Sequence, residues 1–157
     1  MQVYNDYVLM ARDVSVDSRD NMMSIFKMID KFNFSLTAEE YKKFTSEVNR
    51  ENLLFPARFI LTSSWSLDKP VNKSVSVILE SKIADSSGKE LASTSKNAEF
   101  TKGTDRVRFN AETEGLPVSG KGRYTIELIM KSADSKKILS SGTASFQVAI
   151  EQVENTQ

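Results

Sequence analysis

The sequence predicts an all-β protein, an antiparallel β-sandwich of about eight strands with one short α-helix inserted after an N-terminal hairpin. Apolar and polar residues alternate over most of the chain after Pro56, as in strands with one buried face. Turn-forming residues separate these stretches at intervals typical of a sandwich. Only one segment has helical periodicity, which disfavours a parallel α/β sheet because each parallel crossover needs a helix.

We expect one domain, residues 1–151, followed by a flexible tail at residues 152–157. A chain of 157 residues is long enough to bury a core. The sequence shows no internal repeat and no low-complexity tract that would divide the domain.

The first expected element is a β-hairpin. Residues 7–11, YVLMA, form a continuous apolar run, which is typical of a strand covered on both faces. Residues 17–21, DSRDN, have the composition of a turn. A second apolar stretch at residues 22–34 is expected to return as the partner strand.

The segment LTAEEYKKFTSEV, residues 36–48, is the predicted helix. Thr37 and Glu40 have the spacing of a capping box, in which each side chain binds the other residue's backbone N–H. Asn49 and Asn52 are expected to end the helix. The apolar residues of the helix recur at helical spacing and form one narrow stripe: Tyr41, Phe44 and Val48.

The later strands are expected at alternating segments separated by loops. Residues 91–100 are weakly apolar, which suits an edge strand. The loop at residues 85–90 supplies Gly88 for a positive φ, and residues 114–122 are expected to form another loop. The remaining strands are predicted at residues 58–67, 74–83, 106–111, 124–130 and 137–151.

The stretch LPVSGKGRYTIELIM, residues 116–130, resembles the Leu-x(n)-Gly-x-Tyr entry into a late strand of immunoglobulin-like and fibronectin-like sandwiches. The resemblance implies an immunoglobulin-like sandwich in which Tyr124 is the tyrosine of a tyrosine corner. The Cys…Trp…Cys pattern of true immunoglobulin domains is absent, although Trp65 is compatible with a core tryptophan.

The order of segments also resembles a family of small uncharacterised bacterial proteins described as a domain of unknown function. The resemblance rests on the hairpin YVLMARDVSV…NMMSIFKMIDKF, the proline-flanked strand after it, and the late Gly-x-Tyr strand. A glycine often interrupts the second hairpin strand in that family, whereas this chain has Lys27-Met28 there. The resemblance implies a fold but no activity.

Composition excludes several classes of chemistry. The chain has no cysteine, so it forms no disulfide and has no catalytic thiolate. It has no histidine, so it lacks the commonest general base and imidazole metal ligands. We therefore expect no enzyme, no cofactor and no metal site. A histidine-free hydrolase using Glu112 and Glu114, which share one strand face, is a distant third reading.

The balance of charged residues limits the kinds of partner that we expect. Lys plus Arg and Asp plus Glu number 21 each, and this balance argues against a nucleic-acid partner. A weak anion site is considered at Arg106, Arg108 and Arg123. The start of the chain has no signal peptide and no apolar run spans a bilayer, so we expect a cytoplasmic protein without a membrane partner. A small-molecule ligand stays open.

We predict a non-enzymatic protein-interaction or structural module that binds a protein partner or self-associates. Ile60, Ile78 and Ile129 occupy nominally outer strand positions, and they form one patch if their strands are neighbours. The interaction surface would combine this patch with the helix stripe, the helix lying on the outside of one sheet or over its edge. The alternative is that the helix plugs an open end of the sandwich.

The alternative function is a C2-like calcium- or ligand-binding sandwich. Its basis is a set of four aspartates around the first hairpin, since carboxylate oxygens are calcium ligands. Turns also select aspartate for backbone reasons. The four are Asp13, Asp17, Asp20 and Asp30.

Overall fold

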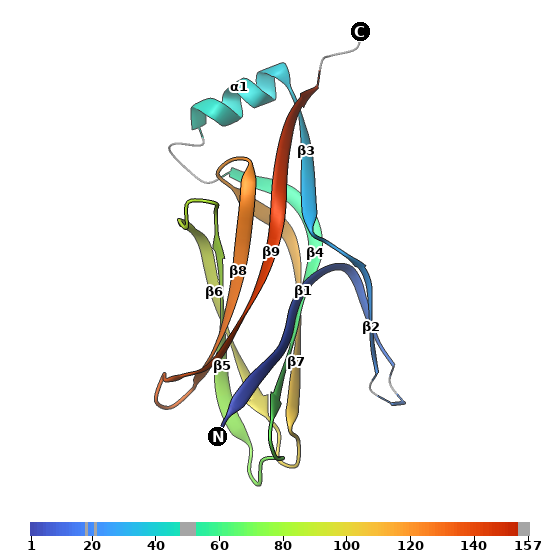
Figure 1. Ribbon diagram of the computed structural model, residues 1–157, viewed down its shortest axis with the longest axis vertical. Coiled ribbons are helices and arrows are strands. Elements are labelled where there is room, and N and C mark those ends of the chain that lie inside the picture. The colour runs from blue at the N-terminus through green and yellow to red at the C-terminus, as the bar shows by residue number, and fades with distance from the viewer. Residues whose placement is uncertain (18, 21, 48–52, 154–157) are drawn as a thin grey trace.

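The computed structural model describes residues 1–17, 19–20, 22–47 and 53–153, and it confirms the predicted β-sandwich (Figure 1). Nine strands and one helix are formed. In chain order they are β1 (Val3–Val16), β2 (Met23–Met28), β3 (Lys31–Thr37), α1 (Ala38–Glu47), β4 (Leu53–Leu67), β5 (Val75–Ala84), β6 (Glu90–Phe100), β7 (Arg106–Val118), β8 (Gly122–Ser132) and β9 (Ile138–Val153).

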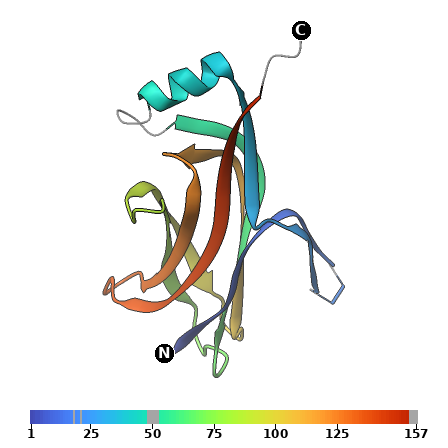
Figure 2. The same cartoon turned by 45° about the horizontal axis from the view of Figure 1, so that its top comes forward.

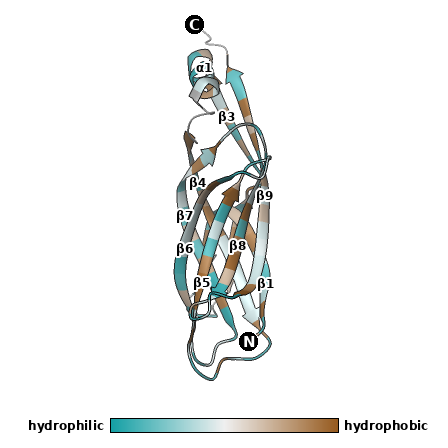
Figure 3. Ribbon diagram, turned by 90° about the vertical axis from the view of Figure 1, so that its left-hand side faces the viewer, coloured by the Kyte–Doolittle hydropathy of each residue, from teal (hydrophilic) through white to brown (hydrophobic). Residues whose placement is uncertain are grey.

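The strands form two sheets. The first sheet has the order β2-β1-β4-β7, and the second has the order β3-β9-β8-β5-β6. Pairing is antiparallel except between β3 and β9, which run parallel. Hydrophobic and hydrophilic residues alternate along these strands (Figure 3), and β6 is an edge strand as predicted.

The prediction of one strand at residues 22–34 was wrong. The segment divides into β2 and β3, which belong to different sheets. Lys27 adopts a φ of 53°, a left-handed conformation that interrupts the regular strand. Two residues later the chain crosses between sheets: the Ile29 N–H binds the Met10 carbonyl of β1, and the Gln147 N–H of β9 binds the Asp30 carbonyl.

Three element boundaries differ from expectation. β4 begins at Leu53 and includes Pro56. β7 continues to Val118, so most of the loop expected at residues 114–122 is strand, because residues 115–118 pair with the extended start of β4. β9 continues to Val153, two residues into the expected tail, because its end pairs with Leu36 and Thr37 of β3.

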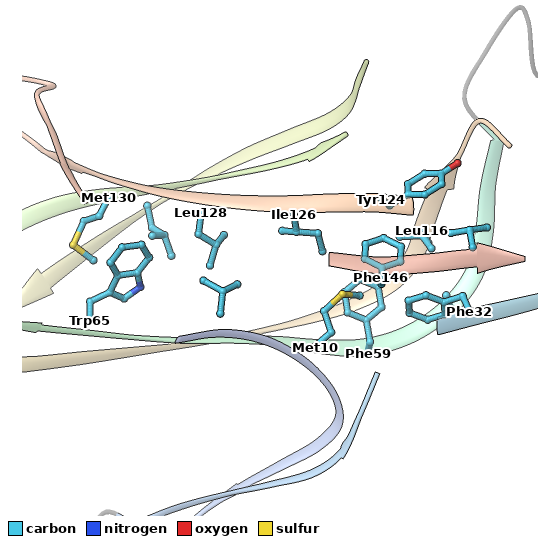
Figure 4. Packing of buried hydrophobic residues seen from close by; sticks show 14 of the residues in the cluster. Met10, Phe32, Phe59, Trp65, Leu116, Tyr124, Ile126, Leu128, Met130 and Phe146 are labelled. Atoms are coloured by element: carbon cyan, nitrogen blue, oxygen red, sulfur yellow. The ribbon is translucent and has the colours of Figure 1, made fainter. Parts of the chain in front are cut away.

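The core fills the space between the sheets (Figure 4). Trp65 and Met130 lie near one end of the core, and Tyr124, Leu116 and Phe32 lie near the other. Trp65 is fully buried, and its Nε1–H donates to the Ser63 hydroxyl at 3.0 Å. A buried indole N–H that has no acceptor costs free energy, so this serine in the core has a clear physical role.

Gly142 allows the two sheets to approach each other closely. A Cβ at this position of β9 would lie 2.7 Å from Val8 Cγ2 and would overlap the Asn5 amide. Both neighbours belong to β1, in the other sheet. The glycine is therefore required where β9 and β1 converge.

The end of β1 and all of β2 form an arm, defined as residues 12–28, which turns back over the outer face of the first sheet (Figures 1 and 2). The Met23 sulfur lies 3.6 Å from the Tyr7 hydroxyl and 3.9 Å from the Thr62 hydroxyl. Thr62 is completely buried although it alternates with the core residues of β4. The arm thus makes a partial third layer.

The helix begins as predicted. The Thr37 N–H donates to the Glu40 carboxylate at 2.8 Å, and the Glu40 N–H donates to the Thr37 hydroxyl at 3.3 Å. The helix reaches Glu47, and the expected stop residues Asn49 and Asn52 lie outside the described residues. This helix of the described chain is not long and apolar enough to cross a membrane.

The predicted tyrosine corner is present. The Tyr124 hydroxyl donates to the Gly120 carbonyl at 2.7 Å and accepts from the N–H groups of Ser119 and Gly120 at 3.0 and 3.1 Å. Gly88 has a φ of 82°, as its loop required.

Candidate functional site

A groove of about 510 Å³ lies beneath α1, at one end of the sandwich. Three elements line it: β3, α1 and the first residues of β4. Most of its lining is apolar, with a few polar side chains. The lining residues are Asn33, Phe34, Ser35, Leu36, Glu40, Lys43, Phe44, Leu53, Leu54, Phe55 and Pro56.

The groove exists because β1 does not pair with the first residues of β4. Pairing between these strands stops at Ala11 and Ile60, where β1 continues into the arm. In the described part of the chain, residues 53–56 and Phe59 of β4 therefore pair with β7 on one side, and residues 53–59 have no strand on the other. Arg12 marks this point, since its guanidinium donates to the Arg58 carbonyl at 3.0 Å.

The opposite wall of the groove is also an open strand edge. β3 lies at the end of the second sheet, with β9 as its neighbour in the described chain. Four consecutive residues of β3 and four of β4 line the groove. Two open edges, one from each sheet, thus border the same apolar space. Pro56 fits an open edge, because proline cannot donate a ladder hydrogen bond.

An aromatic cluster forms the inner surface of the groove. The ring centroids of Phe34 and Phe55 are 4.6 Å apart, and those of Phe44 and Phe55 are 5.5 Å apart in an edge-to-face arrangement. Phe44 and Phe55 are buried, whereas Phe34 remains half-buried. The helix thus covers the end of the core and leaves one aromatic ring partly accessible.

Two charged residues of α1 line the groove, but they are not equally available. The Thr37 N–H donates to Glu40, and this hydrogen bond lowers the pKa of the carboxyl below its ordinary value. Lys43 is exposed, and no hydrogen bond or ion pair engages its ammonium within the described residues. Lys43 therefore gives the rim of the groove a cation for an acidic partner group.

Leu54 projects at the mouth of the groove and is 72% exposed. Its side chain lies against Gly115 of β7, where a Cβ would lie 2.8 Å from Leu54 Cγ. An alanine at position 115 would push the leucine away. The glycine therefore makes room for a large apolar side chain on the surface.

The structure does not bring the predicted interaction surface together. Ile60 belongs to β4 of the first sheet, whereas Ile78 and Ile129 belong to β5 and β8 of the second. The expectation that the three form one patch was therefore wrong. Ile78 and Ile129 lie on adjacent strands beside the Glu80–Lys131 ion pair, whose N–O distance is 2.6 Å.

Of the two positions expected for α1, the outside of a sheet was wrong, whereas the helix does lie at the edge strand β3. The helix follows β3 directly and contacts β3 and the end of β9, so its stripe reaches the open end of the sandwich, which was the alternative considered. Phe44 lines the groove there. Tyr41 is half-buried, and Val48 lies outside the described residues.

The three arginines of the considered anion site do not converge. Arg106 and Arg108 lie at the start of β7, and Arg106 Nε is 3.6 Å from the Asp6 carboxylate. Arg123 follows the turn after the other end of β7. A strand of 13 residues separates the two ends, which is about 40 Å. Strand parity could group residues on a face but could not show this separation.

The acidic candidates are also dispersed or engaged. Asp17 accepts from the Arg19 N–H and Asp20 from the Met22 N–H, which is turn chemistry. Glu112 and Glu114 are both exposed on β7, an edge strand. Within the described residues, no three acidic side chains gather closely enough to hold a metal ion.

Comparisons with known proteins give no family. No family model matches the sequence, and no curated protein is similar to it. Among solved structures, a Bacteroides uniformis β-glucuronidase is similar over 57% of this chain and 11% of its own, with 15% identity and a TM-score of 0.48. A glycosyl hydrolase family 2 member from Bacteroides cellulosilyticus is similar over 62% of this chain and 14% of its own, with 14% identity and a TM-score of 0.48.

The Pseudomonas fluorescens alkylpurine DNA glycosylase AlkC is similar over 90% of this chain and 30% of its own, with 12% identity and a TM-score of 0.44. This chain thus spans a small fraction of each of these proteins. Likenesses at this level carry no argument about function, so the function is argued from the groove alone.

Proposed function

We propose that the protein is a non-enzymatic interaction module that binds an extended peptide in the groove beneath α1. The observation that carries the proposal is the pair of open strand edges facing one apolar space. A peptide that adds a strand to an exposed sheet edge gains main-chain hydrogen bonds, while pockets for alternate side chains give specificity.

The groove offers each part of this recognition mode. The open edge of β4 supplies backbone groups for a new strand. Phe34, half-buried against Phe55, supplies an apolar surface for one peptide side chain. Lys43 supplies a cation for an acidic residue at the rim. Neither a nucleophile nor a paired acid and base is needed for this function.

A selection of displayed random hexapeptides, followed by fluorescence polarisation with the recovered peptides, tests the proposal. We expect peptides with apolar residues at alternate positions. Leu54→Lys should weaken their binding about tenfold or more. Ile138→Lys is the matched control, because Ile138 is also exposed, at 57%, but lies at the start of β9. Equal binding to wild type and Leu54→Lys would refute the groove as the site.

The calcium-binding alternative has weaker support, because Asp17 and Asp20 already accept backbone N–H groups. A melting temperature that rises with calcium chloride and falls on addition of EDTA would favour it. We expect the two curves to coincide.

A further inference from the structure

We propose that the strand that fills the groove is β2 of a second copy of this chain, so that the arm of one molecule inserts beneath α1 of the next. The inference rests on the proposed function, since it requires the groove to accept a strand. It adds the identity of the partner.

The arm carries apolar surface that its own molecule leaves uncovered. Nine large apolar side chains are exposed in the described part of the chain, and four of them lie on the arm. A fifth, Leu54, stands at the mouth of the groove and is the most exposed of the nine. The arm therefore carries more of these exposed side chains than any other element, and the most exposed one marks the groove. The four arm residues are Val16, Met22, Phe26 and Met28.

β2 also has the form that the groove requires. It is an edge strand of six residues, with β1 on one side and no described strand on the other. The open run of β4 spans residues 53–59, so the two edges are about the same length. Met23 and Ile25 are partly buried, whereas Phe26 and Met28, on alternate positions, remain exposed. Those two side chains are free to enter a pocket lined by Phe34 and Phe55.

Charge does not oppose the contact, because neither surface carries a net charge. The arm, residues 12–28, contains Asp13, Asp17 and Asp20 together with Arg12, Arg19 and Lys27. The lining of the groove likewise contains one cation, Lys43, and one carboxylate, Glu40. The contact we propose therefore rests on apolar burial and strand pairing, and not on charge.

The arm and the groove of one molecule lie apart. Hydrogen bonding of Ile29 to Met10 fixes the root of the arm, and the arm points away from α1 (Figures 1 and 2). The contact we propose is therefore between different surfaces of two copies. Such a head-to-tail contact gives a ring if it closes and a filament if it does not.

Engineered cysteines test the contact directly, because the chain has none of its own. We expect a mixture of Phe26→Cys and Leu54→Cys proteins to form a disulfide-linked dimer on mild oxidation. Phe26→Cys mixed with Ile138→Cys is the control and should not cross-link. A Phe26→Cys protein that cross-links efficiently to itself would show an arm-to-arm contact and overturn the proposal.

Complementation provides a second test, by light scattering after size exclusion. We expect wild type to self-associate, and Phe26→Asp and Leu54→Asp each to weaken association about tenfold or more. Their equimolar mixture should form a heterodimer, because one protein keeps an intact groove and the other an intact arm. Melting temperatures close to wild type would confirm that both variants fold, since both side chains are exposed.

A wild-type protein that stays monomeric up to its solubility limit and gives no cross-link overturns the second-copy inference. The proposed function then still stands if the selected hexapeptides bind wild type and lose affinity for Leu54→Lys. If the protein neither self-associates nor binds the selected hexapeptides through Leu54, the groove is not a binding site.

Discussion

The Tyr124 hydroxyl donates a 2.7 Å hydrogen bond to the Gly120 carbonyl, four residues earlier in the chain. The same oxygen accepts from two backbone N–H groups, so one buried side chain satisfies three backbone groups of the β7–β8 turn. The turn is thereby fixed to the strand that follows it.

Tyr124→Phe is predicted to lower the free energy of unfolding by about 1–3 kcal/mol, because it leaves these partly buried turn groups without their partner. Urea denaturation measures the change. Tyr4→Phe is the control: its hydroxyl lies 3.4 Å from the Asp68 carboxylate on the surface and should matter little. Equal stability of Tyr124→Phe and wild type would contradict a structural role for the corner.

The lowered pKa of Asp85 predicts that the stability of the fold depends on pH. Partial burial acts to raise the pKa of this carboxyl, but hydrogen bonds from Ser87, Ser119 and the Lys89 N–H together lower it to about 2, from an ordinary 3.8. A folded-state pKa below the unfolded one means that the carboxylate stabilises the fold above about pH 4. This contribution is lost as the pH falls from about 4 towards 2.

We expect Asp85→Asn to flatten the pH dependence of unfolding in that window by about 1 kcal/mol, a value reduced for solvent screening. Denaturation at a series of pH values measures it. Asp134→Asn, in an exposed turn, should leave the wild-type profile unchanged. A wild-type slope retained by Asp85→Asn would rule out the carboxylate as its source.

The capping box predicts a local effect at the start of α1. Thr37→Ala removes the hydroxyl that accepts from the Glu40 N–H and should destabilise the helix by about 1 kcal/mol. Amide hydrogen exchange in α1 should accelerate while the sheets keep their protection. Thr45→Ala is the matched control, because the Thr45 hydroxyl binds carbonyls within the helix and caps no terminus. Uniform acceleration across the whole protein would argue against a local role.

Gly142→Ala is predicted to destabilise the protein by about 1–3 kcal/mol, because its Cβ would force β9 away from Val8 and Asn5. Thermal unfolding measures the loss. Gly120→Ala has no heavy atom within 4 Å of the new Cβ and should change stability much less. A similar melting temperature for both variants would show that the sheets adjust without cost.

The sequence predicted features that depend on neighbouring residues. Thr37 and Glu40 are three residues apart, and Tyr124 closes a turn of its own strand, so their roles followed from local spacing. The alternation after Pro56 likewise predicted strands with one buried face.

Features that depend on which strands become neighbours were not predictable in this way. Strand parity placed Ile60 and Ile129 on outer faces but could not show that these faces belong to different sheets. The groove was missed because it results from the departure of β1 from β4 at Ala11. The break at Lys27 carried no local signal, because lysine rarely adopts the positive φ that it has there.

The position of Trp65 has a practical consequence for measurement. It is the chain's one tryptophan and is fully buried, so its intrinsic fluorescence should shift to longer wavelength when the fold is lost. Trp65 lies ten residues along β4 from Phe55, which is about 33 Å in an extended strand. Its emission should therefore report global unfolding and stay silent when a peptide occupies the groove, so that the two processes can be followed separately in one unlabelled sample.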